Sequence, residues 1–222
     1  MPMAPGDLSF TAEGLTVLLG GRELVRADSF SLAGGDIAWI SAPSGAGKST
    51  FLRGLTRLID TTGKIYMGDV KSDSIPAHLW RRKVTLLPFP PVPLGDTIEE
   101  DLLAPFKLSV RKGDPLPTQA LMLDYIERCG LDNYGLKRDT DRLSQGELAR
   151  LSIVRTLLSE PDVLLLDEPT ANVDDVSREL LAELVSAFAK GGRIVIATGH
   201  SKPWSSVNRY FEITDGELRE RR

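Results

Sequence analysis

The stretch Ala42-Pro43-Ser44-Gly45-Ala46-Gly47-Lys48-Ser49-Thr50 decides the fold of this chain. An apolar run, Ile37-Ala38-Trp39-Ile40, precedes it and predicts a buried strand, and residues 51–59 after it predict a helix. A glycine-rich turn between a strand and a helix that opens on Lys-Ser is the context of a phosphate-binding P-loop. Small residues let backbone N–H groups point inward at an anion, and the new helix adds unpaired N–H groups at the same place.

Every residue from Ala42 to Thr50 is therefore a candidate nucleotide-binding residue. We expect the Lys48 ammonium to reach the β- and γ-phosphates and the Ser49 hydroxyl to ligate Mg²⁺. The leading glycine of the pattern G-x-x-x-x-G-K-[ST] is replaced by Ala42. Because alanine is the smallest replacement, we expect a constrained loop that keeps its function. The alternative is a glycine-rich turn that binds nothing.

Size and composition narrow the classes of protein. A chain of 222 residues can bury a full core and predicts one α/β domain. With 27 basic and 31 acidic residues, the net charge of −4 gives no sign of a nucleic-acid partner. The one cysteine, Cys129, cannot form an intrachain disulfide, which fits a reducing compartment.

The chain carries no sign of membrane insertion in its sequence. Residues 1–7 lack the basic and apolar regions of a signal peptide. No apolar run approaches the roughly 20 residues that a membrane span needs. We therefore expect a cytoplasmic protein, and any membrane crossing would fall to another chain.

The apolar pattern divides residues 1–222 into a nucleotide-binding core and a helical insert. Short strands at 8–10, 15–19, 24–25 and 30–32, with glycine turns between them, predict an antiparallel edge. We assign residues 8–90 and 159–222 to the core, and residues 95–158 to a helical subdomain. Thr118 and Asp174 precede helical patterns, with Leu121 and Val176 among the residues expected to face the interior.

A proline-rich loop runs from Pro88 to Asp96, with four prolines in the first six positions. Proline at this density excludes both helix and ladder pairing. The segment is therefore a stiff, exposed loop. It either receives a partner or is a plain rigid connector.

Two carboxylates, Asp167 and Glu168, follow an entirely apolar strand. They cannot both be core residues, because burying unpaired charge is too costly. Beside a P-loop, Asp167 can hold Mg²⁺ and Glu168 can polarise the water that attacks the γ-phosphate. The alternative is that they cap the next helix. His200 ends the next buried strand and can contact the γ-phosphate or orient Glu168, unless it is an ordinary surface histidine.

The segment Ser144-Gln145-Gly146-Glu147 opens another helix. Its S-x-x-E pattern is a capping box, in which Ser144 and Glu147 each bond the other's backbone. This reading leaves Gly146 unexplained, because glycine is a poor residue for a first helical turn.

Taken in order, these segments resemble an ATP-binding cassette (ABC) ATPase, and the resemblance covers about residues 8–218. It implies that two copies pair head to tail, with ATP held between the P-loop of one and residues 144–147 of the other. Asn172 and Asp174 would link the two sites. A separate transmembrane permease subunit would sense ATP hydrolysis through the loop from Pro88 to Asp96, with this chain on the cytoplasmic face of the membrane.

The chain departs from that family at three places. The usual signature Leu-Ser-Gly-Gly-Gln is Leu-Ser-Gln-Gly-Glu here, with Gln145 and Glu147 as the changes. The loop glutamine that senses Mg²⁺ is Phe89, which cannot ligate a metal ion. The aromatic platform for adenine is replaced by Val17-Leu18-Leu19, so either Phe10 substitutes or apolar contact alone holds the base.

The leading interpretation is the ATPase that energises a membrane transporter. An ATP-dependent dimerising clamp or regulator with slow hydrolysis and no transport is the alternative, and Phe89 favours it. A soluble P-loop kinase is a third class, against which the signature segment argues.

Overall fold

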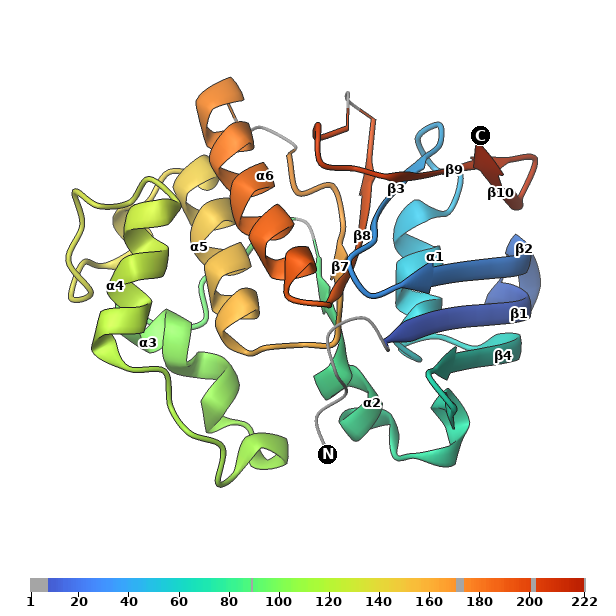
Figure 1. Cartoon of the computed structure of the whole chain (residues 1–222), viewed down its shortest axis with the longest axis horizontal. Coiled ribbons are helices and arrows are strands. Elements are labelled where there is room, and N and C mark those ends of the chain that lie inside the picture. Colours follow the sequence, from blue (N-terminus) through green and yellow to red (C-terminus); the bar gives the residue numbers. More distant parts are fainter. Residues whose placement is uncertain (1–7, 89, 171–173, 201–202, 222) are drawn as a thin grey trace.

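The computed structural model describes residues 8–88, 90–170, 174–200 and 203–221, and a ten-stranded sheet organises them (Figure 1). The strands are β1 (Ser9–Leu19), β2 (Arg22–Ala33), β3 (Ile37–Ser41), β4 (Thr61–Met67), β5 (Val70–Lys71), β6 (Val84–Leu87), β7 (Val163–Leu166), β8 (Ile194–Gly199), β9 (Arg209–Thr214) and β10 (Glu217–Arg221). Their order across the sheet is β5-β4-β1-β2-β10-β9-β3-β8-β7-β6. Parallel pairing joins β9, β3, β8, β7 and β6, whereas β1 pairs antiparallel with β2 and β4. The α/β fold class is confirmed.

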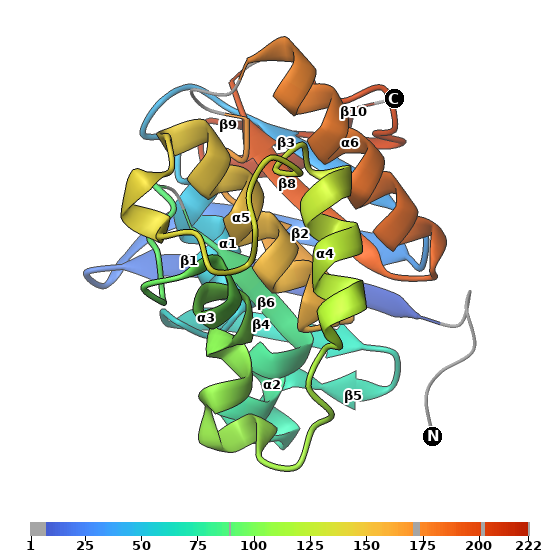
Figure 2. The ribbon, with the colours of Figure 1, turned by 90° about the vertical axis from the view of Figure 1, so that its left-hand side faces the viewer.

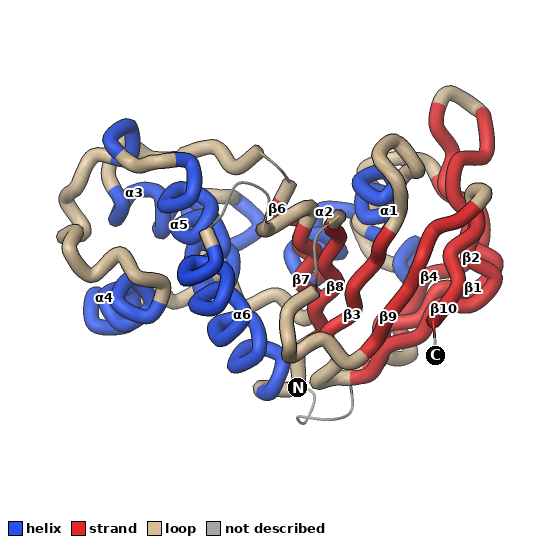
Figure 3. Tube along the Cα trace, turned by 90° about the horizontal axis from the view of Figure 1, so that it is seen from above, coloured by secondary structure: helices blue, strands red, loops and turns tan. Residues whose placement is uncertain are grey.

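Helices cover both faces of the parallel core. They are α1 (Lys48–Leu55), α2 (Ala77–Lys83), α3 (Ile98–Leu103), α4 (Gln119–Arg128), α5 (Gln145–Leu158) and α6 (Asp175–Lys190). Figure 2 shows α4, α5 and α6 together in front of the sheet. Seen from above in Figure 3, the helices from α3 to α6 lie on one side, and the antiparallel strands lie on the other.

Strand β7 is buried on both faces and separates two hydrophobic clusters. Val163 and Leu165 pack into the cluster that contains α1, and Leu164 and Leu166 pack into the cluster that contains α5 and α6. Successive side chains of a strand point to opposite faces, so one apolar run serves both clusters. The continuous apolar sequence of β7 follows from this burial.

The N-terminal edge is antiparallel as expected, but its four predicted short strands are in fact two long ones. Residues 11–13 pair with β2, so the polar positions there do not interrupt β1. Two residues that we expected to face the interior are exposed instead: Leu121 is 41% exposed and Val176 is 70% exposed. Both lie in the first turn of a helix, where the apolar stripe has not yet reached the neighbouring elements.

The predicted helix starts at Thr118, Ser144 and Asp174 are confirmed, and Thr97 begins α3 in the same way. The side chains of Thr97, Thr118, Ser144 and Asp174 each accept a hydrogen bond from a backbone N–H three residues later.

In Figure 1 the first turns of α1, α5 and α6 all point to the upper side of the molecule, as do the carboxyl ends of β7 and β8. Ligands of open α/β sheets bind at such an edge. None of the described helices is both long enough and apolar enough to cross a bilayer.

Candidate nucleotide site

The P-loop lies between β3 and α1, and glycines shape it. Gly45 and Gly47 have φ of 77° and 97°, a region that other residues avoid. A Cβ at Gly47 would also lie 2.5 Å from Cγ2 of Val25, so no side chain fits there. Ala42 is not among the described non-glycine residues with positive φ, so alanine is accommodated without backbone strain at the first position of the pattern.

Lys48 is the first residue of α1, and its side chain is buried against the loop. Its Nζ donates to the carbonyl oxygen of Ala42 at 3.0 Å and lies 3.4 Å from that of Pro43. Burial lowers the pKa of Lys48 below its ordinary value, although the carboxylates of Glu168 and Asp167 oppose this shift. A bound phosphate would place further negative charge beside the ammonium and so oppose this effect of burial.

Lys48, Glu168 and His200 converge on one point from three separate segments. Nζ of Lys48 lies 2.9 Å from Nε2 of His200 and 3.8 Å from Oε1 of Glu168. Nε2 of His200 lies 3.0 Å from the same Glu168 oxygen. Parallel strands carry these residues to a common edge, because Glu168 follows β7 and His200 follows β8.

Asp167 is fixed by a residue that the sequence analysis did not assign. The Thr198 hydroxyl of β8 donates to Oδ1 of Asp167 at 2.8 Å and accepts from the backbone N–H of Glu168 at 3.1 Å. Thr198 is fully buried. A hydroxyl at the end of a buried apolar strand, beside the strand that bears the carboxylates, is the signal that would have identified it. Glu168 has φ of 45°, so its backbone is strained at this position.

The predicted capping box is present at the start of α5. The Ser144 hydroxyl accepts from the Glu147 N–H at 3.3 Å, and the Glu147 carboxylate accepts from the Ser144 N–H at 2.8 Å. Glu147 also accepts from the Tyr134 hydroxyl at 2.8 Å. Burial opposes ionisation of Glu147, but these hydrogen bonds outweigh it and lower its pKa. Ser144 and Gln145 are exposed, so this helix end is open to another molecule.

Asp174 caps α6, with its carboxylate accepting from the N–H and the hydroxyl of Ser177 at 2.9 and 2.6 Å. Arg150 of α5 also donates to the Ser177 hydroxyl. The start of α6 is thereby tied to the signature helix. Asn172 and Phe89 lie outside the described residues.

Comparison with known proteins identifies the family. A family model described as ABC transporter matches residues 25–171, which is more than half of the chain. The chain belongs to the ABC transporter family. It is an ATPase, the ATP-binding subunit that energises transport. The P-loop, residues 144–147 and the pair Asp167 and Glu168 all lie within the matched range, and Asp174 lies just beyond its end.

Relatives in this family are ATP-binding subunits with different cargoes. The probable iron export ATP-binding protein FetA of Escherichia coli (strain K12) is 31% identical over 180 residues, which is 81% of this chain and 78% of that protein. The manganese transport system ATP-binding protein MntB of Listeria monocytogenes is 28% identical over 207 residues, which is 90% of this chain and 82% of that protein.

Solved ABC structures have the same fold. A bacterial Atm1-family ABC exporter with ATP bound matches with a TM-score of 0.82 and 25% identity. The match covers 99% of this chain and 40% of the exporter chain, so this chain spans less than half of that protein. A dimeric ATP-binding cassette bound to ADP and Pi matches with a TM-score of 0.78 and 23% identity, over 96% of this chain and 97% of that one.

Of the two alternatives for holding adenine, the one in which Phe10 substitutes for the aromatic platform of the ABC family is ruled out. Phe10 is fully buried and stacks on Trp80, with ring centroids 6.2 Å apart. It therefore has no face to offer a base. Val17 is also fully buried, whereas Leu19 is 56% exposed at the end of β1. The other alternative, in which apolar contact alone holds the base, is compatible with the exposed side chain of Leu19.

A groove lies beside the proline-rich loop of this ABC subunit. Its volume is about 680 Å³, and its walls come from α2, β6, the proline-rich loop, residues 104–111 and the last turns of α5. Apolar side chains line much of it, including Leu86, Pro91, Val92, Leu94 and Leu108. The proline-rich loop is therefore part of a concave surface large enough to hold a short segment of another chain.

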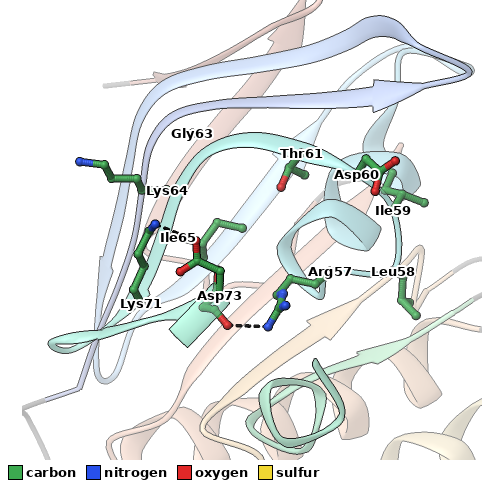
Figure 4. Close-up of a pocket in the computed structure, with 11 residues that line it drawn as sticks. Arg57, Leu58, Ile59, Asp60, Thr61, Gly63, Lys64, Ile65, Lys71 and Asp73 are labelled. Carbon is green, nitrogen blue, oxygen red and sulfur yellow. Dashed lines mark hydrogen bonds and ion pairs between the residues drawn. The ribbon is translucent and has the colours of Figure 1, made fainter. Parts of the chain in front are cut away.

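A second cavity, of about 310 Å³, lies beyond the last turn of α1 and is polar (Figure 4). Arg57 donates there to the carbonyl oxygens of Ser72 and Ile75, and Lys71 lies 2.7 Å from Asp73. Lys64 points away from this cluster (Figure 4). The cavity lies at the opposite end of α1 from the P-loop, so it does not take part in the nucleotide site.

Proposed function

We propose that Lys48, Glu168 and His200 form the hydrolytic centre of this ATPase. The observation that carries the proposal is their convergence, since one glutamate oxygen lies within 4 Å of both an ammonium and an imidazole nitrogen. A carboxylate in this position can polarise a water molecule, and the ammonium can balance the charge of the γ-phosphate. ATP itself would lie on the backbone N–H groups of residues 42–50.

Before ATP binds, Lys48 and Glu168 compete for the same ring nitrogen of His200. Nε2 of His200 cannot accept from Lys48 and donate to Glu168 at the same time, because one ring nitrogen has one role per tautomer. A γ-phosphate would draw Lys48 to itself. Nε2–H of His200 would then be free to hold Glu168, which supports a role for His200 in orienting the base.

Ser49 and Asp167 fit a Mg²⁺ site. Mg²⁺ prefers oxygen ligands and usually keeps water and substrate phosphates, so it needs only one or two protein groups. The Thr198 hydroxyl occupies Oδ1 of Asp167 and orients its carboxylate. The ion would neutralise charge on the phosphates.

A second copy of the chain would complete each site. The first turns of α1 and α5 point to the same side of the molecule, and Figure 3 shows them on either side of β7 and β8. A two-fold axis between the helices would place the exposed Ser144 and Gln145 of one copy, with the half-buried Gly146, over the P-loop of the other. The free N–H groups at the start of α5 would then face the γ-phosphate. Asn172 and Asp174 would lie between the two sites.

The transmembrane permease subunit would dock in the groove beside the proline-rich loop. The apolar lining and the size of the groove support a short amphipathic segment as its occupant. The chain would thus lie on the cytoplasmic face of the membrane. Residues 95–158 would act as the helical subdomain that moves with that segment, and residues 8–90 and 159–222 as the nucleotide-binding core.

The test is Glu168→Gln in the whole chain, with Glu183→Gln, at an exposed position of α6, as the matched control. We expect MgATP to shift Glu168→Gln to a dimer in size-exclusion chromatography, with turnover reduced by about 100-fold or more. The wild type and Glu183→Gln should hydrolyse MgATP. A wild type that dimerises with ATP but never turns it over would instead favour the clamp or regulator.

A further inference from the structure

A buried ion pair joins two helices of the helical segment. Asp101 of α3 is 0% exposed and Arg155 of α5 is 5% exposed. Nη1 of Arg155 lies 2.8 Å from both carboxylate oxygens of Asp101. Charges at this depth are tolerated only when they are paired and hydrogen-bonded, and hydrophobic residues can often replace them without loss of stability. The pair therefore calls for a role besides stability.

This pair also holds the proline-rich loop. The backbone N–H of Leu94 donates to Oδ2 of Asp101 at 2.6 Å, and Arg155 donates to the carbonyl oxygen of Val92 at 3.3 Å. Prolines lack an N–H, so this loop has few donors with which to fix itself. The position of Val92 and Leu94, which line the groove, is consequently set by Asp101 and Arg155.

A second anchor ties the end of the loop to the segment just before α5. The Thr140 hydroxyl donates to the carbonyl oxygen of Gly95 at 2.7 Å, and its N–H donates to that of Asp96 at 2.9 Å. Ser144 follows within four residues as the N-cap of α5. The loop is thus held near both ends of α5. At about 1.5 Å per residue, Arg155 lies about 15 Å along the same helix from Gln145.

We propose that Asp101 and Arg155 are positioning residues that pass occupancy of the groove to the signature end of α5. A segment bound in the groove displaces Val92 and Leu94. The ion pair carries that displacement to α5, which moves as one rod and shifts Ser144 relative to the P-loop of the partner copy. This inference rests on the proposed function, in which the groove receives a permease and Ser144 closes over ATP.

The test uses a chemical label in place of the permease. Val92 is 55% exposed in the groove, and Val92→Cys can carry a bulky maleimide. The native Cys129 is buried, and burial raises its pKa to about 12, so it stays unlabelled. In the Glu168→Gln chain, the readout is the MgATP concentration that gives half dimer, compared with and without label.

The comparison is made in three versions of that chain. One keeps the ion pair, one carries Asp101→Leu with Arg155→Met, and one carries Arg82→Met. The double variant removes both charges, so neither is left unpaired. Arg82→Met is the matched control. Arg82 also lines the groove, but its ion pair is with Asp114 and not with a residue of α5, and Asp114 retains Arg111 at 3.4 Å.

We expect the label to change the half-dimer concentration about fivefold or more when the pair is present and in Arg82→Met. In the double variant the ratio of labelled to unlabelled chain should be close to one. An equal label effect with and without the pair, or no label effect in the chain that keeps it, overturns the inference. Absence of any ATP-driven dimer in the unlabelled chains would instead overturn the proposed function itself.

Discussion

Nζ of Lys48 lies 2.9 Å from Nε2 of His200, although 152 residues separate them in the chain. Glu168 closes the group, since its Oε1 lies 3.0 Å from the same histidine nitrogen. The P-loop lysine is therefore already in contact with the candidate base and with the residue that would orient it. In the proposed site a γ-phosphate would draw Lys48 away from His200. Substitution of each of the three residues tests this arrangement.

Lys48→Ala should abolish high-affinity ATP binding. The ammonium is the only charged group that the P-loop sequence offers to the phosphates, and hydrogen bonds to charged groups contribute about 1.5–3 kcal/mol. We expect ATP affinity to fall about 10- to 100-fold in a calorimetric titration. Lys64→Ala is the control, because Lys64 is exposed and distant from the loop. Unchanged binding in Lys48→Ala would mean that the P-loop assignment is wrong.

His200→Ala should slow hydrolysis far more than it weakens binding. If His200 orients Glu168, steady-state turnover of MgATP falls by about 100-fold while ATP affinity changes little. His78→Ala, on α2, is the matched control for losing a histidine, assayed on the chain without a membrane partner. A loss of turnover that matches the loss of affinity would assign His200 to binding alone.

Tyr134→Phe should make the protein less stable to acid. The Tyr134 hydroxyl is among the groups that lower the pKa of Glu147. Because this pKa is lowered in the folded state, ionised Glu147 stabilises the fold above its ordinary pKa, and that stabilisation is lost as the pH falls through the folded value. Without the hydroxyl the folded value rises, so the loss begins at a higher pH.

Circular dichroism during acid titration measures this shift. The midpoint of acid unfolding should move to higher pH in Tyr134→Phe. Tyr125→Phe should leave it in place, because Tyr125 packs on Arg128 and has no described hydrogen bond to a carboxylate. Identical midpoints for Tyr134→Phe and wild type would remove Tyr134 from the capping arrangement.

Gly95→Ala should destabilise the helical segment. A Cβ at Gly95 would lie 2.4 Å from the backbone nitrogen of Asp101, and rigid backbone cannot move aside cheaply. Overpacking of this kind costs about 1–3 kcal/mol of unfolding free energy, measured by urea denaturation. Gly135→Ala is the control: a Cβ there meets nothing within 4 Å, so the change should be less than about 1 kcal/mol.

Short-range patterns predicted the helix starts and most of the buried faces, but they failed for a few single residues. The helix caps at Thr118, Ser144 and Asp174 depend on residues three positions apart, and all are present. Phe10, Leu121 and Val176 were misplaced, because their burial depends on which distant element packs against them. Trp80 stacks on Phe10, and the local sequence pattern could not predict this contact because 70 residues separate the two.

The sequence by itself determined the P-loop, the paired acids after β7 and the capping box, since each is a set of neighbouring residues whose chemistry follows from local geometry. Only the tertiary structure decided that Thr198 orients Asp167, that Tyr134 holds Glu147 and that Asp101 and Arg155 fasten the proline-rich loop. These contacts join segments that are adjacent only after strands pair and helices pack. Hydrogen bonds act over about 3 Å, so the fold must form before such partners exist.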